Sequence, residues 1–219
     1  MSKRALIVWG GWDGHQPEQV SKIFEKVLIS EGFAVERHNS LAPMQDEKLL
    51  DTLNLVVPIW TMGGIDDKPG DAIYKAVADK GIGIAGCHGG MCDAFRTHTE
   101  WQFMTGGQWV SHPGNDGTTY TVNVQNTGHP ITQGISDFDV CSEQYYMHVD
   151  PAVRVLATTR FPVAAGPHVP NGNIDMPVVW TKHYGKGRIF FNSLGHLANV
   201  VESEPCLTLI RRGLLWAAK

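Results

Sequence analysis

Histidines are the residues of this sequence best suited to chemistry, and His88 occupies the most informative turn. The stretch Gly86-Cys87-His88-Gly89-Gly90 has glycines two places before and two places after His88. Such glycines relieve the crowding at a sharp strand-to-helix elbow, which holds a reactive side chain above a parallel sheet. A helix N-terminus favours the neutral imidazole, which can act as a base, a hydrogen-bond donor or a metal ligand. The alternative is that His88 only satisfies nearby backbone groups.

Other polar side chains follow apolar runs, and in doubly wound sheets ligands bind beyond the carboxyl ends of the strands. We predict His88, His196 and Glu143 as catalytic residues, with the two histidines facing one cleft. A zinc or other divalent transition-metal site needs about three protein ligands. The donors available for it are His15, His88, His112, Glu143, His148 and His196. Among them we predict His88, His112 and His196 as the metal ligands. The alternative for Glu143 and His148 is a surface carboxylate beside a solvated histidine.

Aromatic side chains in the same predicted loops indicate a sugar ligand, because flat aromatic faces pack well against the apolar C–H face of a pyranose ring. Four tryptophans lie in or beside these loops: Trp9, Trp12, Trp60 and Trp109. Of these, Trp9 is expected in the core. The predicted substrate-binding residues are Trp12, Asp13, His15, Trp60, Thr61, Gly89 and Tyr145.

The first half of the chain alternates apolar runs with helical patterns, which indicates βαβ units on a parallel sheet. Helix 17–30 is the clearest, because Val20, Phe24 and Leu28 recur at helical spacing and Pro17 suits a first turn. The strands expected in this half are 4–9, 33–37, 55–59 and 81–86, and the other helices are 46–53 and 69–79.

The second half consists mainly of predicted strands separated by turn signals. These strands are expected at 118–124, 138–143, 154–159, 177–183 and 188–192, before a last helix at 205–217. Between the halves, the glycine-rich stretch 95–117 is expected to run as a loop over one face of the sheet. No repeat or linker divides the chain, so we predict one domain over residues 1–219.

The composition argues against several classes of protein. A formal net charge of −4 without any basic run is unfavourable for nucleic-acid binding. The longest early apolar run, 5–9, is far below the ~18 residues that a membrane span needs. We therefore expect no membrane association and a cytoplasmic location. The four cysteines form no C-x-x-C pair and are expected to be free thiols. The sequence is compatible with a homo-oligomer.

Several stretches, in their order along the chain, resemble the ThuA-like proteins, the trehalose-utilisation family of the class I glutamine amidotransferase-like fold. The resemblance covers nearly the whole chain. It depends on Gly86–Gly90, Gly128–Thr132, Glu143–Tyr145, Pro177–Trp180, Gly185–Arg188, Leu194–His196 and Arg212–Ala217. The resemblance implies an α/β fold, namely a flavodoxin-like three-layer sandwich with a mostly parallel, doubly wound sheet. It also places His196 near the His88 elbow.

The resemblance implies a role in the metabolism of trehalose or a related disaccharide. Glutamine amidotransferases carry a cysteine at the elbow, and an imidazole cannot form their acyl intermediate, so glutaminase activity is not expected.

We predict an enzyme that acts on a small-molecule sugar, including one oxidised to a ketone, by isomerisation, epimerisation or elimination. His88 would be the base or a metal ligand, His196 the partner acid and Glu143 an orienting group. A divalent metal such as zinc is the one cofactor considered. The alternatives are a non-catalytic sugar-binding or regulatory module and a metal-dependent hydrolase.

Overall fold

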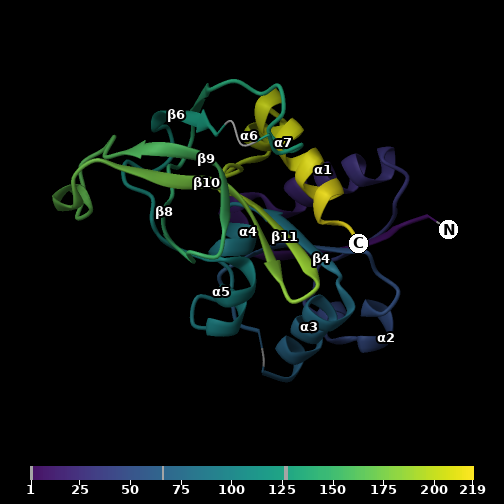
Figure 1. Ribbon diagram of the computed structural model, residues 1–219. Helices are drawn as coiled ribbons and strands as arrows, with labels where there is room; N and C mark the ends of the chain where they lie inside the picture. The colour runs from purple at the N-terminus through teal and green to yellow at the C-terminus, as the bar shows by residue number, and fades with distance from the viewer. Residues whose placement is uncertain (1, 66, 126–127) are drawn as a thin grey trace.

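The computed structural model describes residues 2–65, 67–125 and 128–219, without the side chains of residues 67–70. Within these residues a nine-stranded sheet forms the middle layer, in the order β2-β1-β3-β4-β11-β10-β9-β6-β7. Helices cover both faces of this sheet (Figure 1). A separate two-stranded sheet pairs β5 with β8. The predicted three-layer α/β architecture is confirmed.

About half of the large sheet is parallel, and its strands are largely buried between helices, except for the edge strand β2. These strands are β1 (Arg4–Gly11), β2 (Ala34–His38), β3 (Leu55–Thr61), β4 (Gly83–Cys87) and β11 (Gly187–Asn192). The apolar run Ala5–Val8 of β1 is completely buried, as expected for a strand that is covered on both faces. The carboxyl ends of the parallel strands meet at one edge of the sheet, where ligands bind in such folds.

Helices lie on both faces of the parallel strands (Figure 1). On one face are α1 (Pro17–Ser30), α6 (Ala198–Glu202) and α7 (Glu204–Ala217), and on the other is α3 (Asp67–Lys80). α1 has the predicted bounds and buries Val20, Phe24 and Leu28 against the sheet. Two apolar cores result, one on each face of the sheet.

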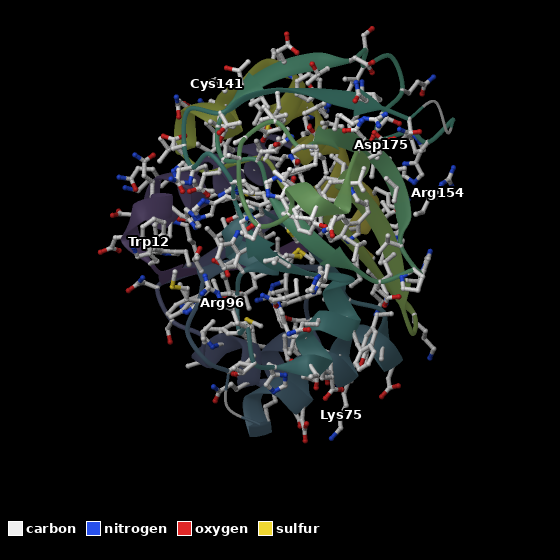
Figure 2. The ribbon with its side chains drawn as sticks, turned by 90° about the vertical axis from the view of Figure 1, so that its left-hand side faces the viewer. Trp12, Lys75, Arg96, Cys141, Arg154 and Asp175 are labelled. Atoms are coloured by element: carbon white, nitrogen blue, oxygen red, sulfur yellow. The ribbon has the colours of Figure 1, made fainter. Side chains whose placement is uncertain are left out.

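The remaining strands of the large sheet are antiparallel. They are β6 (Thr119–Val124), β7 (Phe138–Cys141), β9 (Arg154–Phe161) and β10 (Ile174–Tyr184). The expected strand 138–143 ends two residues early, so Glu143 lies in the chain that leaves β7. In Figure 2, Asp175 of β10 and Arg154 of β9 lie on the opposite side of the view from Trp12, which follows β1.

The stretch 95–117 is more regular than the expected loop. After the short α4 (Gly89–Cys92) it contains α5 (Thr99–Thr105) and β5 (Gly107–Ser111), and β5 pairs with β8 (Tyr146–Val149). The prediction failed because β5 is short and polar, and its partner is distant in sequence. α5 is held to the sheet by Trp101 and Met104, which are completely buried.

The other elements are short connections between these layers. They are the 3-10 helices η1 (Asp13–His15), η2 (Ala42–Gln45) and η3 (Val169–Asn171), and helix α2 (Glu47–Leu50). All four cysteines are free, as expected. In the described part of the chain, no helix is long and apolar enough to cross a membrane.

Candidate functional site

The turn after β4 has the geometry of an elbow, with His88 at its apex. His88 has φ 48° and ψ −140°, a conformation that non-glycine residues rarely adopt and that is typical of functional sites. The next residue must be small, because a Cβ on Gly89 would lie 2.4 Å from Cε1 of His15. The predicted elbow is therefore present, and its glycine leaves room for a second histidine.

His15 and His196 reach the elbow from the ends of two other parallel strands. His15 lies in η1 after β1, and its Nδ1 is 2.8 Å from Oγ1 of Thr61 at the end of β3. His196 follows β11. The ring centroids of His15, His88 and His196 lie 4.7 to 5.4 Å apart. The carboxyl-end rule thus explains how three histidines, distant in sequence, come together.

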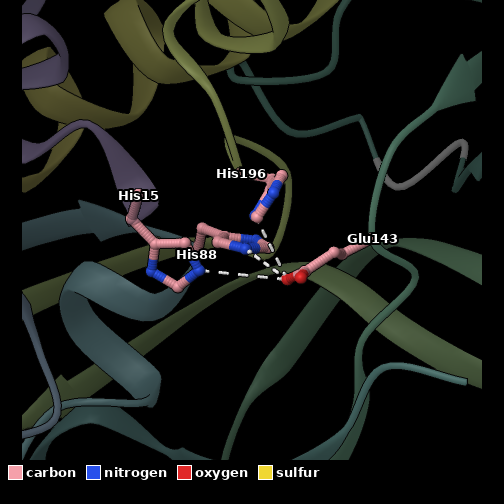
Figure 3. Close-up of side chains that lie close together, drawn as sticks. All are labelled: His15, His88, Glu143 and His196. Carbon is pink, nitrogen blue, oxygen red and sulfur yellow. Dashed lines mark hydrogen bonds and ion pairs between the residues drawn. The ribbon is translucent and has the colours of Figure 1, made fainter. Parts of the chain in front are cut away.

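Glu143 completes the group from the antiparallel half of the molecule. It follows β7, and its backbone carbonyl accepts a hydrogen bond of 2.9 Å from the hydroxyl of Tyr120 in β6. Figure 3 shows its carboxylate directed at the three imidazoles. All four side chains are buried.

One carboxylate oxygen, Oε2 of Glu143, is the common neighbour of the three rings. It lies 3.1 Å from Nε2 of His88, 3.3 Å from Nδ1 of His196 and 3.9 Å from Nε2 of His15. The four ligand atoms all lie within 4.8 Å of one another. Around a tetrahedral ion with bonds of ~2.0 Å, ligand atoms are separated by about 3.3 Å. The spacing of this group is therefore close to that of a metal coordination shell.

A hydrogen bond behind the His88 ring leaves its Nε2 free to bind a metal. Nδ1 of His88 lies 2.7 Å from the Ser193 carbonyl, which can only accept, so Nδ1 carries the proton. In the neutral ring Nε2 then has a lone pair, and this lone pair faces the Glu143 carboxylate. Metal-binding histidines commonly donate their other N–H to a carbonyl in this way. A cation between the two groups would turn their contact from repulsive to attractive.

Burial and charge set the protonation of the group. Desolvation lowers the pKa of His88 to about 4, although the neighbouring Glu143 opposes this shift. Burial alone would raise the pKa of Glu143, but its interactions with His15 and His196 outweigh burial and hold the pKa well below its usual value. At neutral pH the site therefore combines an ionised carboxylate with a neutral His88.

The site is more enclosed than the cleft expected from the sequence. The cavity that touches His15, His88 and Gly89 has a volume of about 10 Å³, room for about one water molecule or an ion of that size. A larger cavity of about 520 Å³ lies elsewhere, along α5, β5 and β8, and includes His148 among its lining residues. His148 is therefore separate from the group around Glu143.

His112 lies at the edge of the group. Its Nε2 is 3.7 Å from the other carboxylate oxygen of Glu143, Oε1, and its side chain is 31% exposed. Of the predicted metal ligands, the structure thus brings His88 and His196 together with His15 and Glu143, and leaves His112 on the solvent side. The donors are far apart in the sequence, so their spacing along the chain did not indicate which of them lie close together in the fold.

The predicted substrate-binding residues divide into two sets. Tyr145 stacks on His88, with ring centroids 3.9 Å apart. Trp12 is 47% exposed, and its ring makes an edge-to-face contact with the ring of His15. In contrast, Asp13 is exposed to solvent, and Trp60 packs over Gly10 and against the core. Thr61 and Gly89 position His15, as described above.

Two further expectations concern residues outside the group. Trp9 is only partly buried, and it packs against one core with the Arg37 guanidinium 5.5 Å from its ring. Nδ1 of His129 accepts a hydrogen bond of 3.3 Å from the amide of Ile131, so this histidine caps a turn. The Ser193 carbonyl and the Tyr120 hydroxyl were not predicted, because no sequence pattern marks a group whose role is to hold another.

Comparison with known families gives the relationship of the chain. The ThuA family model, described as trehalose utilisation, matches residues 4–217. The chain belongs to this family. A search of curated proteins finds no match.

Solved structures similar to this ThuA-family chain include relatives and more distant folds. A ThuA-like protein from Bacteroides uniformis superposes with a TM-score of 0.76 at 18% identity, covering 97% of this chain and 89% of that one. A cytoplasmic protein from Salmonella typhimurium has a TM-score of 0.69 at 13% identity, covering 99% of this chain and 100% of that one. A glutamine amidotransferase from Thermotoga maritima has a TM-score of 0.56 at 12% identity, covering 99% and 96%. The predicted amidotransferase-like fold is confirmed.

The elbow of this ThuA protein offers no thiolate nucleophile. Cys87 precedes the apex and is buried, and desolvation raises the pKa of its thiol far above the usual value. The neighbouring Cys206 raises it further. The residue presented at the apex is His88.

Proposed function

We propose that this ThuA-family protein is a metal-dependent enzyme that acts on a sugar, with a divalent ion held by His15, His88, Glu143 and His196. The observation that carries the proposal is the convergence of three imidazole nitrogens on one carboxylate oxygen at 3.1 to 3.9 Å. Each of the three histidines follows a different parallel strand, so the arrangement depends on rigid elements of the fold.

The ligand set favours a first-row transition ion. Imidazole nitrogens and a carboxylate oxygen suit zinc, iron or manganese better than they suit calcium or magnesium, which prefer oxygen ligands alone. Four protein ligands leave one position on a five-coordinate zinc ion, or two on an octahedral ion, for a substrate oxygen. Such an ion polarises a carbonyl or hydroxyl oxygen and stabilises the negative charge that develops there.

The protein groups around the ion suggest how protons are moved. Because His88 and His196 would be ligands, His112 is the histidine left free for acid–base chemistry. Its partial exposure and its position 3.7 Å from Oε1 of Glu143 support this role. This assignment replaces His196 by His112 as the proposed partner acid.

The substrate class is supported by the family and by the mouth of the site. The family is described by trehalose utilisation. Trp12 is half-exposed beside His15 and offers an aromatic face to a sugar ring. A cytoplasmic location is part of the proposal, and the similar Salmonella protein is titled a cytoplasmic protein.

Metal analysis tests the proposal most directly. Protein purified without an affinity tag is analysed for bound metals, stripped with a chelator and titrated with zinc and manganese. We expect one ion per chain, and loss of this ion in the His88→Ala and Glu143→Gln variants. His148→Ala is the matched control, because His148 is an exposed histidine outside the group. Equal metal binding by all of these proteins would overturn the metal centre.

Turnover of sugars then separates an enzyme from a binding module. Metal-loaded protein is incubated with trehalose and with trehalose oxidised to a ketone, and the products are followed by NMR. We expect conversion that is lost with chelator and restored by the ion. Saturable binding of these sugars without any product over hours would instead favour the non-catalytic module.

A further inference from the structure

Three neighbouring aromatic side chains, of which His112 contacts Glu143, carry buried polar atoms that have no hydrogen-bond partner among the described residues. These atoms are the hydroxyl of Tyr145, Nε1 of Trp109 and Nδ1 of His112. The ring centroids of the three residues lie 5.5 to 6.4 Å apart. Buried polar groups are nearly always satisfied, so several unsatisfied groups in one place indicate a missing partner.

Tyr145 connects this cluster to the proposed metal centre. Its ring stacks on His88 with centroids 3.9 Å apart and an interplanar angle of 28°. The Tyr145 ring is also nearly parallel to that of His112, with centroids 6.4 Å apart and an interplanar angle of 26°. The side chain is only 2% exposed, so water does not compensate for the missing hydrogen bond at the surface. A phenylalanine would fill the same space without this unsatisfied hydroxyl.

Trp109 is held in place by a charged pair. The guanidinium of Arg96 lies over the Trp109 ring, 4.3 Å from its centroid. Arg96 is bound in turn to Asp93, with Nη2 donating to Oδ2 at 2.9 Å. Because the arginine is already neutralised by Asp93, the surroundings of the indole favour a neutral oxygen over an anion. The indole N–H can only donate, so its partner must be an acceptor.

We infer that Tyr145 and Trp109 form an oxygen-binding subsite next to the ion, which binds a second oxygen of the substrate. The substrate class is then a sugar with two adjacent oxygens, a hydroxy-ketone or a vicinal diol, with one oxygen on the ion and the other on this subsite. The inference depends on the proposed metal centre, because it assigns the first oxygen to the ion. It makes Tyr145 and Trp109 residues that determine which sugars bind.

The test uses cobalt(II) as the ion and hydroxyacetone as the probe, since this small neutral ligand is a hydroxy-ketone with two adjacent oxygens. Binding is followed by the visible absorption of the cobalt. We expect the Tyr145→Phe and Trp109→Phe variants to take up cobalt like the unmodified protein but to bind hydroxyacetone about tenfold more weakly, roughly 1.4 kcal/mol each. Tyr146→Phe is the matched control, because the hydroxyl of Tyr146 is bound to Asn171 instead.

The outcomes separate the two hypotheses. Unchanged hydroxyacetone affinity in both cobalt-loaded variants overturns the subsite and leaves the metal centre standing. Failure of the unmodified protein to take up cobalt overturns the metal centre and the subsite with it. If Tyr145→Phe does not retain cobalt, the affinity measured for Trp109→Phe decides whether the subsite exists. Unlike Tyr145, which stacks on His88, Trp109 has no ring stacked on a proposed ligand among the described residues. A tenfold loss in the control variant as well would also count against the subsite.

Discussion

The parallel and antiparallel halves of the sheet contribute to the site in different ways. The parallel half supplies His15, His88 and His196, each in the first residues after a strand or in the short helix that follows it. The antiparallel half supplies Glu143, although β7 lies five places from β4 in the strand order. The chain after β7 must therefore return from the edge of the sheet to its centre. The positions of the histidines follow from a general rule of parallel sheets. The position of the Glu143 carboxylate depends instead on the path of the chain after β7.

Removal of a histidine from the parallel half is expected to have the largest effect. His88→Ala should weaken metal binding by about 1,000-fold, since loss of an outer-shell partner alone costs ~10–100-fold. Competition with a chromogenic chelator measures the affinity, and circular dichroism checks the fold. A change of less than tenfold would mean that the elbow histidine is not a ligand, and the contrast between the halves would disappear.

Acidification should destabilise the metal-free protein through protonation of both His88 and Glu143. The pKa of His88 in the folded state, about 4, lies below that of an unfolded histidine, so the unfolded chain binds the proton first. Stability should therefore fall by about 3 kcal/mol as the pH is lowered from 7 to 4. Glu143, whose pKa is also lowered, adds a loss of the same sign at pH values below its ordinary pKa. Urea denaturation at a series of pH values measures this, and a flat profile from pH 7 to 5 would contradict it.

The hydrogen bond behind His15 should have an intermediate effect. Thr61→Val keeps the shape of the side chain but removes the hydroxyl that is 2.8 Å from Nδ1 of His15. We expect metal affinity to fall ~10–100-fold, because an outer-shell partner orients the ligating ring. Thr208→Val on α7 is the control, since Thr208 is bound to Glu204 on the helix surface. Equal affinities of the two variants would show that His15 needs no such support.

Replacement of two tyrosines of the antiparallel half should have the smallest effects. Loss of the Tyr120 hydroxyl should lower the stability of the protein, whereas loss of the Tyr145 hydroxyl should not. Tyr120→Phe removes a buried hydrogen bond to the Glu143 carbonyl and should destabilise the protein by about 1 kcal/mol. Tyr145→Phe removes a buried hydroxyl that has no partner within residues 2–65, 67–125 and 128–219, and should leave stability unchanged or raise it slightly. Thermal unfolding of both metal-free variants gives the comparison. A loss of stability in Tyr145→Phe as large as in Tyr120→Phe would show that the Tyr145 hydroxyl is already satisfied.

The sequence was most informative where a local rule applies. The elbow at His88 could be predicted because its glycines are required by the backbone, and His196 because it follows an apolar strand. The Glu143 carboxylate was singled out by residue type, but nothing local indicated that it meets three histidines. The prediction of His112 rather than His15 as a metal ligand had no local basis, since distances between loops depend on how the strands are ordered. β5 and β8 were missed because their pairing joins residues about forty positions apart.

The sequence by itself determined the helices and strands of the parallel half, the elbow and the absence of a cysteine nucleophile at its apex. These features depend on hydrophobic period, glycine conformation and side-chain chemistry, all of which are local. Only the tertiary structure decided that His15 and Glu143 join His88 and His196 while His112 remains at the edge. The physical reason is that a coordination shell requires ligand atoms within a few ångströms of one another, and that proximity is created by the packing of two halves of a sheet whose strands are far apart in the chain.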